Sequence, residues 1–317
     1  MVEHHCDCRL WAQAVALLYQ LYSILHKCTL FFLSVFIITS SLIEFSQVPV
    51  FLNHFFTVLD TETYQAIKAS GFMANEFAPN EYRRTVRGDR SYAGIYFYGT
   101  NTYFEFFDAA SRGPGSLGFS MLAFGVDQPG ELRSLQSALA DTYPLTERKI
   151  SRDYNDSQIA WFDQASPSTV KATTSLGYGA WIMEYDPTFL SVWNPGASSG
   201  SGISRSAVLA RYVSVLQDAP SDPCFEDIVG LTIALDPVSL QDAVDLARAL
   251  GFKEQSTGNA RIFTAADFVL RLQPVAEDGR GVREMTLRVH KNPDQREYRL
   301  GKSTLIFGED DLARWTF

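Results

Sequence analysis

The chain has 317 residues, of which 46% are hydrophobic and 20% charged, so it is long and apolar enough to fold around a core of its own. This size and composition exclude a small disulfide- or metal-stapled scaffold and an intrinsically disordered protein. With 36 acidic and 27 basic side chains, a net charge of −9 and no run of Lys or Arg, the chain has none of the features of a nucleic-acid-binding protein.

The first 47 residues form an apolar region that differs from the rest of the chain. Residues 11–25 and 28–43 are apolar runs, and neither alone reaches the roughly 20 residues that cross a bilayer. Lys27, the apolar stretch 30–38 and the small residues after it have the form of a secretory leader. We therefore predict that residues 1–47 are a signal peptide or a membrane anchor, that the protein is secreted or exported, and that only this segment contacts a membrane. A buried helical hairpin is the alternative interpretation.

The next part of the chain has the pattern of short strands with one helix among them. A strand is predicted over 48–60, a helix over 61–70, and three further strands over 81–88, 91–99 and 102–109. The order is strand, helix, strand, strand, strand. This βαβββ unit is the first of several with the same shape.

A second unit follows in the same order. A strand is predicted over 118–127 and a helix over 129–140, in which Leu132, Leu135 and Leu139 recur at helical spacing. The segments RKISRDY, SQIAWFD and YGAWIMEYD are then candidate strands. Two units of one shape indicate an internal repeat.

The second half of the chain repeats the pattern less completely. A third unit begins at Asp227, and in a fourth the segments 282–291 and 303–317 look like strands with no full helix between them. Between the halves, residues 194–204 have the composition of a linker and residues 204–217 the pattern of a bridging helix.

These repeats predict an α+β fold in which tandem βαβββ units form two domains. The first domain is expected over residues 48–193 and the second, abbreviated, over 225–317. The linker with its bridging helix takes residues 194–224.

Three strand-turn-helix openings carry a resemblance to a known superfamily. LNHFFTVLDTETYQAI, FSMLAFGVDQPGELRSL and GLTIALDPVSLQDAVDLARALGF each end a strand in an Asp before a helix. Over roughly residues 48–317 the repeated units resemble the vicinal-oxygen-chelate superfamily of glyoxalases, bleomycin-resistance proteins and extradiol dioxygenases, as an uncharacterised, glyoxalase-like exported branch. The resemblance implies two glyoxalase-like domains with curved sheets around a cleft. It implies little about activity, because that fold hosts unrelated chemistries.

The resemblance also implies a metal site. In metal-binding members the ligands converge from the first and fourth strands of two paired units, and the matching positions here hold His54, Glu105 and Glu184. These residues would hold one divalent ion, zinc, manganese, nickel or iron(II), with Glu184 as the catalytic general base. The fourth position, in the strand FSMLAFGV, holds no usual ligand.

Side-chain alternation along the strands predicts which residues share a strand face with His54 and Glu105, the two predicted ligands of the first unit. Period two places His54 with Leu52 and Phe56, and Glu105 with Tyr103. A buried carboxylate without a partner costs several kcal/mol or stays protonated. A metal, an arginine of the neighbouring strand or an exposed strand face would each explain a glutamate in such a strand.

Aromatic residues on the same strands suggest a ligand pocket. Tyr96 and Tyr98 share one strand face, Tyr103 joins them across the next turn, and Phe56 lies on the first strand. Aromatic walls with a few polar tips suit flat organic ligands. Cross-strand packing in a β-rich core is the alternative interpretation.

We therefore expect a small-molecule-binding protein of the vicinal-oxygen-chelate type, with catalysis unproven. One alternative is a metal-dependent lyase or isomerase of the glyoxalase type, and a further one is a protein-interaction module. The missing fourth ligand favours binding without a metal. In that case no cofactor is expected, and the partner is a small-molecule ligand, with no nucleic acid.

Overall fold

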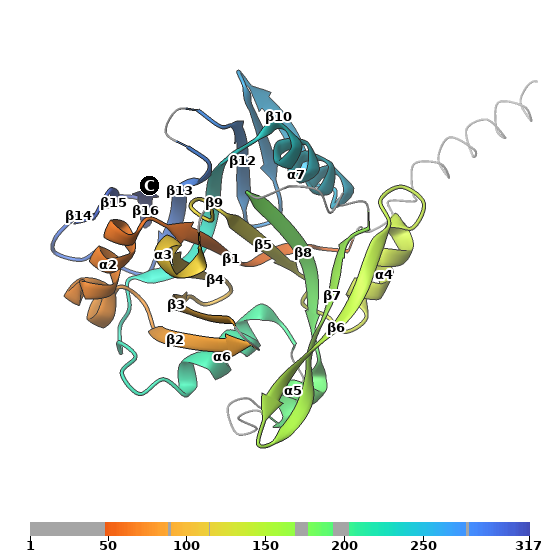
Figure 1. Cartoon of the computed structure of the whole chain (residues 1–317), viewed down its shortest axis with the longest axis horizontal. Coiled ribbons are helices and arrows are strands. Elements are labelled where there is room, and N and C mark those ends of the chain that lie inside the picture. The colour runs from red at the N-terminus through yellow and green to blue at the C-terminus, as the bar shows by residue number, and fades with distance from the viewer. Residues whose placement is uncertain (1–47, 88–89, 114, 169–176, 193–202, 277–278) are drawn as a thin grey trace, which may run out of the picture. The chain divides into compact units, whose positions relative to one another are not determined.

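Two eight-stranded sheets form the framework of the part of the chain that the structure describes (Figure 1). The structure is a computed structural model. The described residues are 48–87, 90–113, 115–168, 177–192, 203–276 and 279–317. All of them fall in one compact unit, Val48–Phe317, and the predicted leader or anchor lies outside the described residues. No helix in the described part of the chain is long and apolar enough to span a membrane.

The first sheet has the strand order β2-β3-β4-β1-β5-β8-β7-β6. Its strands are β1 (Phe51–Leu59), β2 (Asn80–Arg87), β3 (Arg90–Tyr98), β4 (Tyr103–Asp108), β5 (Ser120–Gly125), β6 (Leu145–Tyr154), β7 (Ser157–Pro167) and β8 (Tyr178–Tyr185). The helices of this part of the chain are α2 (Thr61–Ala69), the short π-helix η1 (Met73–Phe77), α3 (Ala109–Arg112), α4 (Glu131–Leu139), α5 (Pro187–Val192) and α6 (Arg205–Ser214). β1 pairs parallel with β4 and antiparallel with β5, and β5 pairs parallel with β8. This sheet therefore consists of two βαβββ units joined along β1 and β5.

The second sheet has the corresponding order β10-β11-β12-β9-β13-β16-β15-β14. Its elements are β9 (Phe225–Leu235), α7 (Pro237–Ala249), β10 (Lys253–Thr257), β11 (Ala260–Thr264), β12 (Val269–Pro274), β13 (Gly281–Val289), β14 (Glu297–Leu300), β15 (Ser303–Phe307) and β16 (Leu312–Thr316). The described residues between β13 and β14 form no helix, so the last unit is abbreviated. The predicted α+β fold of tandem βαβββ units in two glyoxalase-like domains is thus confirmed. Below, each sheet with its helices is called the first or the second domain.

Aspartates at strand ends start two of the helices. The side chain of Asp60 accepts a hydrogen bond from the Thr63 amide at the start of α2, and the side chain of Asp236 does the same for the amides of Val238 and Ser239 at the start of α7. Such caps satisfy amides that have no partner within the helix. The Asp that ends each strand in the repeated openings therefore has a structural role in these two units.

The two domains share one hydrophobic core, centred on a tryptophan of the last strand. Trp315 is fully buried and meets the rings of Phe104 and Phe106 at centroid distances of 6.0 and 5.3 Å. Phe77 stacks on Phe225 at 5.6 Å across the same junction. Because large aromatic side chains dominate core energetics, these contacts hold the two sheets in one folding unit.

Candidate functional site

A β-bulge in β1 turns His54 toward the face of the first sheet that α6 covers, which we call the inner face. In the pairing of β1 with β5, Leu52 lies opposite Phe124 and His54 opposite Ala123, so Asn53 is the extra residue. A bulge re-aims the side chains beyond it. Leu52 is therefore part of the shared core, and the expectation that it lies on one face with His54 is wrong.

His54 is a buried and neutral imidazole. Its ring stacks on Tyr103 at 4.3 Å and meets Trp181 edge-on at 5.4 Å. Nδ1 lies 2.8 Å from Oδ1 of Asn53. An amide oxygen only accepts, so Nδ1 carries the proton and Nε2 keeps its lone pair. Burial lowers the pKa of His54 to about 3.

Glu105 lies on the same face, in β4. It is opposite Phe56 of β1 and Tyr96 of β3, and its side chain is partly exposed. Burial raises the pKa of Glu105 to about 7, against the opposing effect of the Arg83 charge, a hydrogen bond with Tyr96 and the Arg112 charge. Near neutral pH, Glu105 can therefore both accept and donate a proton.

Arg83 lies over an aromatic ring beside Glu105. Its guanidinium carbon is 4.0 Å from the centroid of the Tyr96 ring, and Nη1 is 3.4 Å from Oε1 of Glu81. The Tyr98 hydroxyl donates to the same Glu81 oxygen at 2.5 Å. Arg83 is thus held by a ring and a carboxylate, which fixes its charge at one side of the inner face.

Arg112 occupies an aromatic cage at the end of α3. Its guanidinium carbon lies 4.9, 5.0 and 5.6 Å from the ring centroids of Phe107, Tyr92 and Phe56. Gly94 makes room for this cage, because a Cβ atom there would come within 2.6 Å of the Phe107 ring. A guanidinium stacked on rings keeps the N–H donors in its plane for an acceptor.

α6 covers the other part of the inner face. Tyr212 of this helix stacks on Tyr98 at 5.8 Å, and its hydroxyl accepts a hydrogen bond from Nε1 of Trp161 at 3.0 Å. Val208 and Leu209 are buried in the same cluster. Figure 1 shows α6 lying close to β2 and β3. A helix therefore forms within the predicted range 204–217, and it packs against the inner face of the first sheet.

The four residues predicted to line the pocket have different surroundings. Tyr98 and Tyr103 are buried in the cluster that contains α6, and Tyr96 is buried under the guanidinium of Arg83. Phe56 is partly exposed and meets Phe107 at 5.2 Å. Phe56 therefore belongs to the part of the face that α6 leaves open.

The structure does not bring Glu184 to His54 and Glu105. The carboxylate of Glu184 accepts hydrogen bonds from the amides of Gly130 and Leu132, at 2.8 and 2.9 Å, at the start of α4. Side chains alternate along β8, so Glu184 lies on the opposite face from Trp181, the neighbour of His54. The need to cap α4 explains this carboxylate without a metal or catalytic role.

The inner face does not fit a resident metal ion. No group of three or more His, Cys, Asp or Glu side chains among the described residues is placed to hold one. Without Glu184, the predicted set leaves one imidazole and one carboxylate. The positive charges of Arg83 and Arg112 act on Glu105, and they would oppose a divalent cation there.

Sequence reasoning missed the two features that shape the open part of this face, which are the cage around Arg112 and the cover provided by α6. Arg112 comes four residues after β4, outside any strand pattern. For α6, the apolar residues Val208, Leu209 and Tyr212 on one helix face were a usable signal of a buried face, although the sequence does not say against which surface.

Comparisons with known proteins assign a family without a function. A model of DUF5829, a family of unknown function, matches residues 52–317. No curated protein matches the chain.

Several solved structures are similar in fold. One is a hypothetical protein from Staphylococcus aureus, with 8% identity, coverage of 71% of this chain and 86% of that chain, and a TM-score of 0.43. Another is a triple mutant of 4-hydroxymandelate synthase from Streptomyces coelicolor, with 13% identity, coverage of 74% and 69%, and a TM-score of 0.37. A third is a fusion of a xylose isomerase-like TIM barrel with 4-hydroxyphenylpyruvate dioxygenase, with 10% identity, coverage of 75% of this chain and 36% of that chain, and a TM-score of 0.39. At these TM-scores the likenesses carry no argument about activity.

Proposed function

Because the chain belongs to the DUF5829 family, whose function is unknown, we propose a function from its inner face: a small-molecule-binding protein of the vicinal-oxygen-chelate type. The proposed ligand is a flat organic molecule with a polar edge. The observation that carries the proposal is Glu105, a partly exposed carboxyl group with a pKa of about 7, between two arginines on an aromatic face. Titratable groups with strongly perturbed pKa values are common at functional sites.

The aromatic part of the face supplies a stacking surface. Phe56 and Tyr92 are partly exposed, and each meets the buried ring of Phe107 edge-on, at 5.2 and 5.6 Å. These contacts fix the ring orientations, so little rotamer entropy is lost when a flat ligand stacks against them.

The polar edge of the ligand would meet Glu105 and Arg112. Arg112 offers several N–H donors to a carbonyl or anionic oxygen. With its pKa of about 7, Glu105 hydrogen-bonds a hydroxyl or a carbonyl group according to its own protonation state. The same pKa would allow Glu105 to exchange a proton with a bound ligand.

A thermal-shift screen followed by calorimetry tests this proposal. Phenols, hydroxybenzaldehydes and 1,2-dicarbonyl compounds are screened at neutral pH against the wild type and the variants Arg112→Gln, Glu105→Gln and Arg271→Gln. We expect at least one class to bind, about tenfold more weakly in Arg112→Gln and unchanged in Arg271→Gln, the control in the second sheet. Binding of no class, or equal losses in Arg112→Gln and Arg271→Gln, would refute the proposal.

The metal-dependent lyase or isomerase remains the alternative that the resemblance implies. The donor set on the inner face does not support it, so we expect protein purified without chelators to contain no stoichiometric metal. Elemental analysis decides between the two. If the wild type contains one equivalent of metal and His54→Ala contains none, the metal-dependent enzyme is favoured over the metal-free binding protein.

We also propose that residues 1–47 direct export, as their composition predicts. N-terminal sequencing of protein from its native host tests this separately. An intact Met1 on protein recovered from the cytosol would contradict it.

A further inference from the structure

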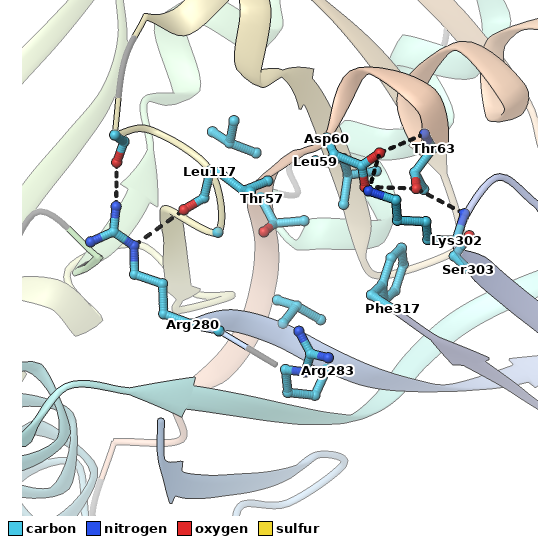
Figure 2. Close-up of a pocket in the computed structure, with 15 residues that line it drawn as sticks. Thr57, Leu59, Asp60, Thr63, Leu117, Arg280, Arg283, Lys302, Ser303 and Phe317 are labelled. Carbon is cyan, nitrogen blue, oxygen red and sulfur yellow. Dashed lines mark hydrogen bonds and ion pairs between the residues drawn. The ribbon is translucent and has the colours of Figure 1, made fainter. Parts of the chain in front are cut away.

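A cavity of about 660 Å³ lies where the first and second domains meet (Figure 2). The first domain contributes the end of β1, the start of α2 and residues 115–118, and the second contributes the start of β13, the turn at Lys302 and the ring of Phe317. Neither Glu105 nor Arg112 lines it, so it is separate from the open part of the inner face. Its volume is within the usual range of small-molecule sites.

The charges around this cavity are mainly positive. Arg280, Arg283 and Lys302 line it with a single acidic side chain, Asp60, in a chain whose net charge is −9. The carboxylate of Asp60 accepts hydrogen bonds from the amide and hydroxyl of Thr63, at 3.1 and 2.8 Å, and lies 3.7 Å from Nζ of Lys302. Outside the lining, Oε2 of Glu62 lies 4.0 Å from the same Nζ. A concentration of basic groups in a concave site attracts anions.

A β-bulge places Arg283 in the cavity wall. In the pairing of β13 with β9, Val282 lies opposite Ile233 and Glu284 opposite Thr232, so Arg283 is the extra residue. Bulges are common next to functional sites because they re-aim one side chain. Figure 2 shows the guanidinium of Arg283 rising from β13 into the space between Arg280 and Lys302.

Glycines and hydrogen bonds hold the walls of the cavity in place. Gly118 and Gly281 have φ values of 74° and 110°, and a Cβ atom on Gly281 would come within 2.6 Å of the Gly118 carbonyl oxygen. Glycine is therefore needed where the two domains touch. Arg280 holds the same junction by donating to the carbonyls of Leu117, at 3.1 Å, and Gly115. A preformed site avoids the cost of ordering its walls on binding.

We propose that this interdomain cavity binds a small organic anion, a carboxylate or a phosphate carried on an apolar body. Arg283 and Lys302 provide the charge that recognises the anionic group. The side chains of Val58, Leu117 and Val282 provide apolar wall for the remainder of the molecule.

Calorimetry on the full chain with four probes tests the proposal. The probes are naphthalene-2-carboxylate, 2-naphthyl phosphate, inorganic phosphate and the uncharged naphthalene-2-carboxamide. At least one naphthyl anion should bind saturably, and about tenfold more tightly than the amide. Tight binding of only the carboxylate or only the phosphate ester identifies the anionic group.

Variants locate the binding. Arg283→Gln and Lys302→Gln should each weaken it about tenfold, whereas Arg288→Gln, an exposed residue of the same strand, should leave it unchanged. Arg280 is left intact because it holds the domain junction. Urea unfolding of each variant controls for a folding defect, and Lys302→Gln carries the test if Arg283→Gln is unstable.

The proposal would be overturned by no binding of either naphthyl anion, by equal binding of the amide, or by an equal loss in Arg288→Gln. A loss in Arg112→Gln without a loss in Arg283→Gln would place the probe on the inner face and also overturn it. Failure of the phenol and dicarbonyl screen would refute the function proposed for the inner face and leave this result standing.

Discussion

The two sheets have the same strand order, but the central antiparallel pair has one irregularity in the first sheet and three in the second. In the first sheet the extra residue is Asn53 of β1, which turns His54 onto the inner face. One of those in the second is the bulge at Arg283 of β13, which lines the cavity between the domains. The counterpart of Asn53 is Val229 of β9, the extra residue between Ile228 and Gly230, whereas β5, the counterpart of β13, has no bulge like the one at Arg283. Two sheets of one topology thus differ in where their irregular positions lie.

The inner faces of the two sheets also carry different residues at equivalent positions. In the first sheet Glu105 pairs with Phe56 among aromatic rings. At the equivalent pair of the second sheet, Arg271 lies opposite Thr232, and both are partly exposed. An ionisable group is buried by its neighbours rather than by the sheet itself, so we expect pH-sensitive stability from the first inner face.

The largest expected effect tests whether the two sheets fold together. Trp315→Ala removes a fully buried ring that contacts Phe104 and Phe106 of the first sheet, and should lower the free energy of unfolding by about 3–5 kcal/mol. Urea denaturation should show one transition at a lower midpoint. Two separate transitions in the wild type would show that the sheets are independent. Ile306→Ala, at a side chain that is 46% exposed, is the control.

The next effect tests the burial of His54. Its pKa of about 3 lies below the usual 6.5, so the unfolded chain takes up a proton first as the pH falls. The associated stability is complete above pH 6.5 and is lost toward pH 3. His54→Gln should remove this acid-side slope of about 1 kcal/mol per pH unit, as measured by urea unfolding at several pH values. Phe56→Leu, which changes the same face without a titrating group, should retain it. An unchanged slope in His54→Gln would show that the imidazole is solvated.

A smaller effect with the opposite sign is expected from Glu105. Its pKa of about 7 lies above the usual 4.5, so the stability linked to it is complete below pH 4.5 and is lost as the pH rises through 7. Between pH 5 and pH 8, the free energy of unfolding should therefore fall by about 1–2 kcal/mol more in the wild type than in Glu105→Gln. Arg271→Gln, at the matching position of the second sheet, should show no such change. Equal pH profiles for the wild type and Glu105→Gln would contradict the perturbed pKa.

The smallest effect concerns the cover of the inner face by α6. Tyr212→Phe removes the acceptor of the Trp161 hydrogen bond and should cost about 1 kcal/mol in free energy of unfolding. Tyr298→Phe, in the second sheet, keeps the ring that stacks on Phe72 at 3.8 Å and should cost less. If the two substitutions have equal effects, the bond between α6 and β7 does not stabilise the cover.

Much of the fold could be predicted from the sequence, because alternation along strands and leucine spacing along helices are local signals. The predicted strands over 81–88, 91–99 and 102–109 correspond to β2, β3 and β4 within one residue at each end. β14 was missed because its four residues, Glu297–Leu300, are too few to show a period.

The candidate site was less predictable, because it depends on features that no local pattern encodes. One inserted residue, Asn53, separates Leu52 from the face of His54. Glu184 has a carboxylate, a side chain of the type that binds metals, but it caps α4. Its neighbour along the chain, Tyr185, faces the cluster under α6. The side chain direction follows from strand register and from the need to cap α4, both of which are tertiary properties.

The most direct test of the central claim, that the open part of the first inner face binds a small molecule, is an NMR titration. Amide spectra of the labelled protein are recorded with the tightest compound from the phenol and dicarbonyl screen. We predict that shift changes cluster on β1, β4 and α3, and that about tenfold more compound is needed to saturate them in Arg112→Gln. Shift changes confined to β9, β12 and β13, or saturation of Arg112→Gln at the same concentration as the wild type, would contradict the account.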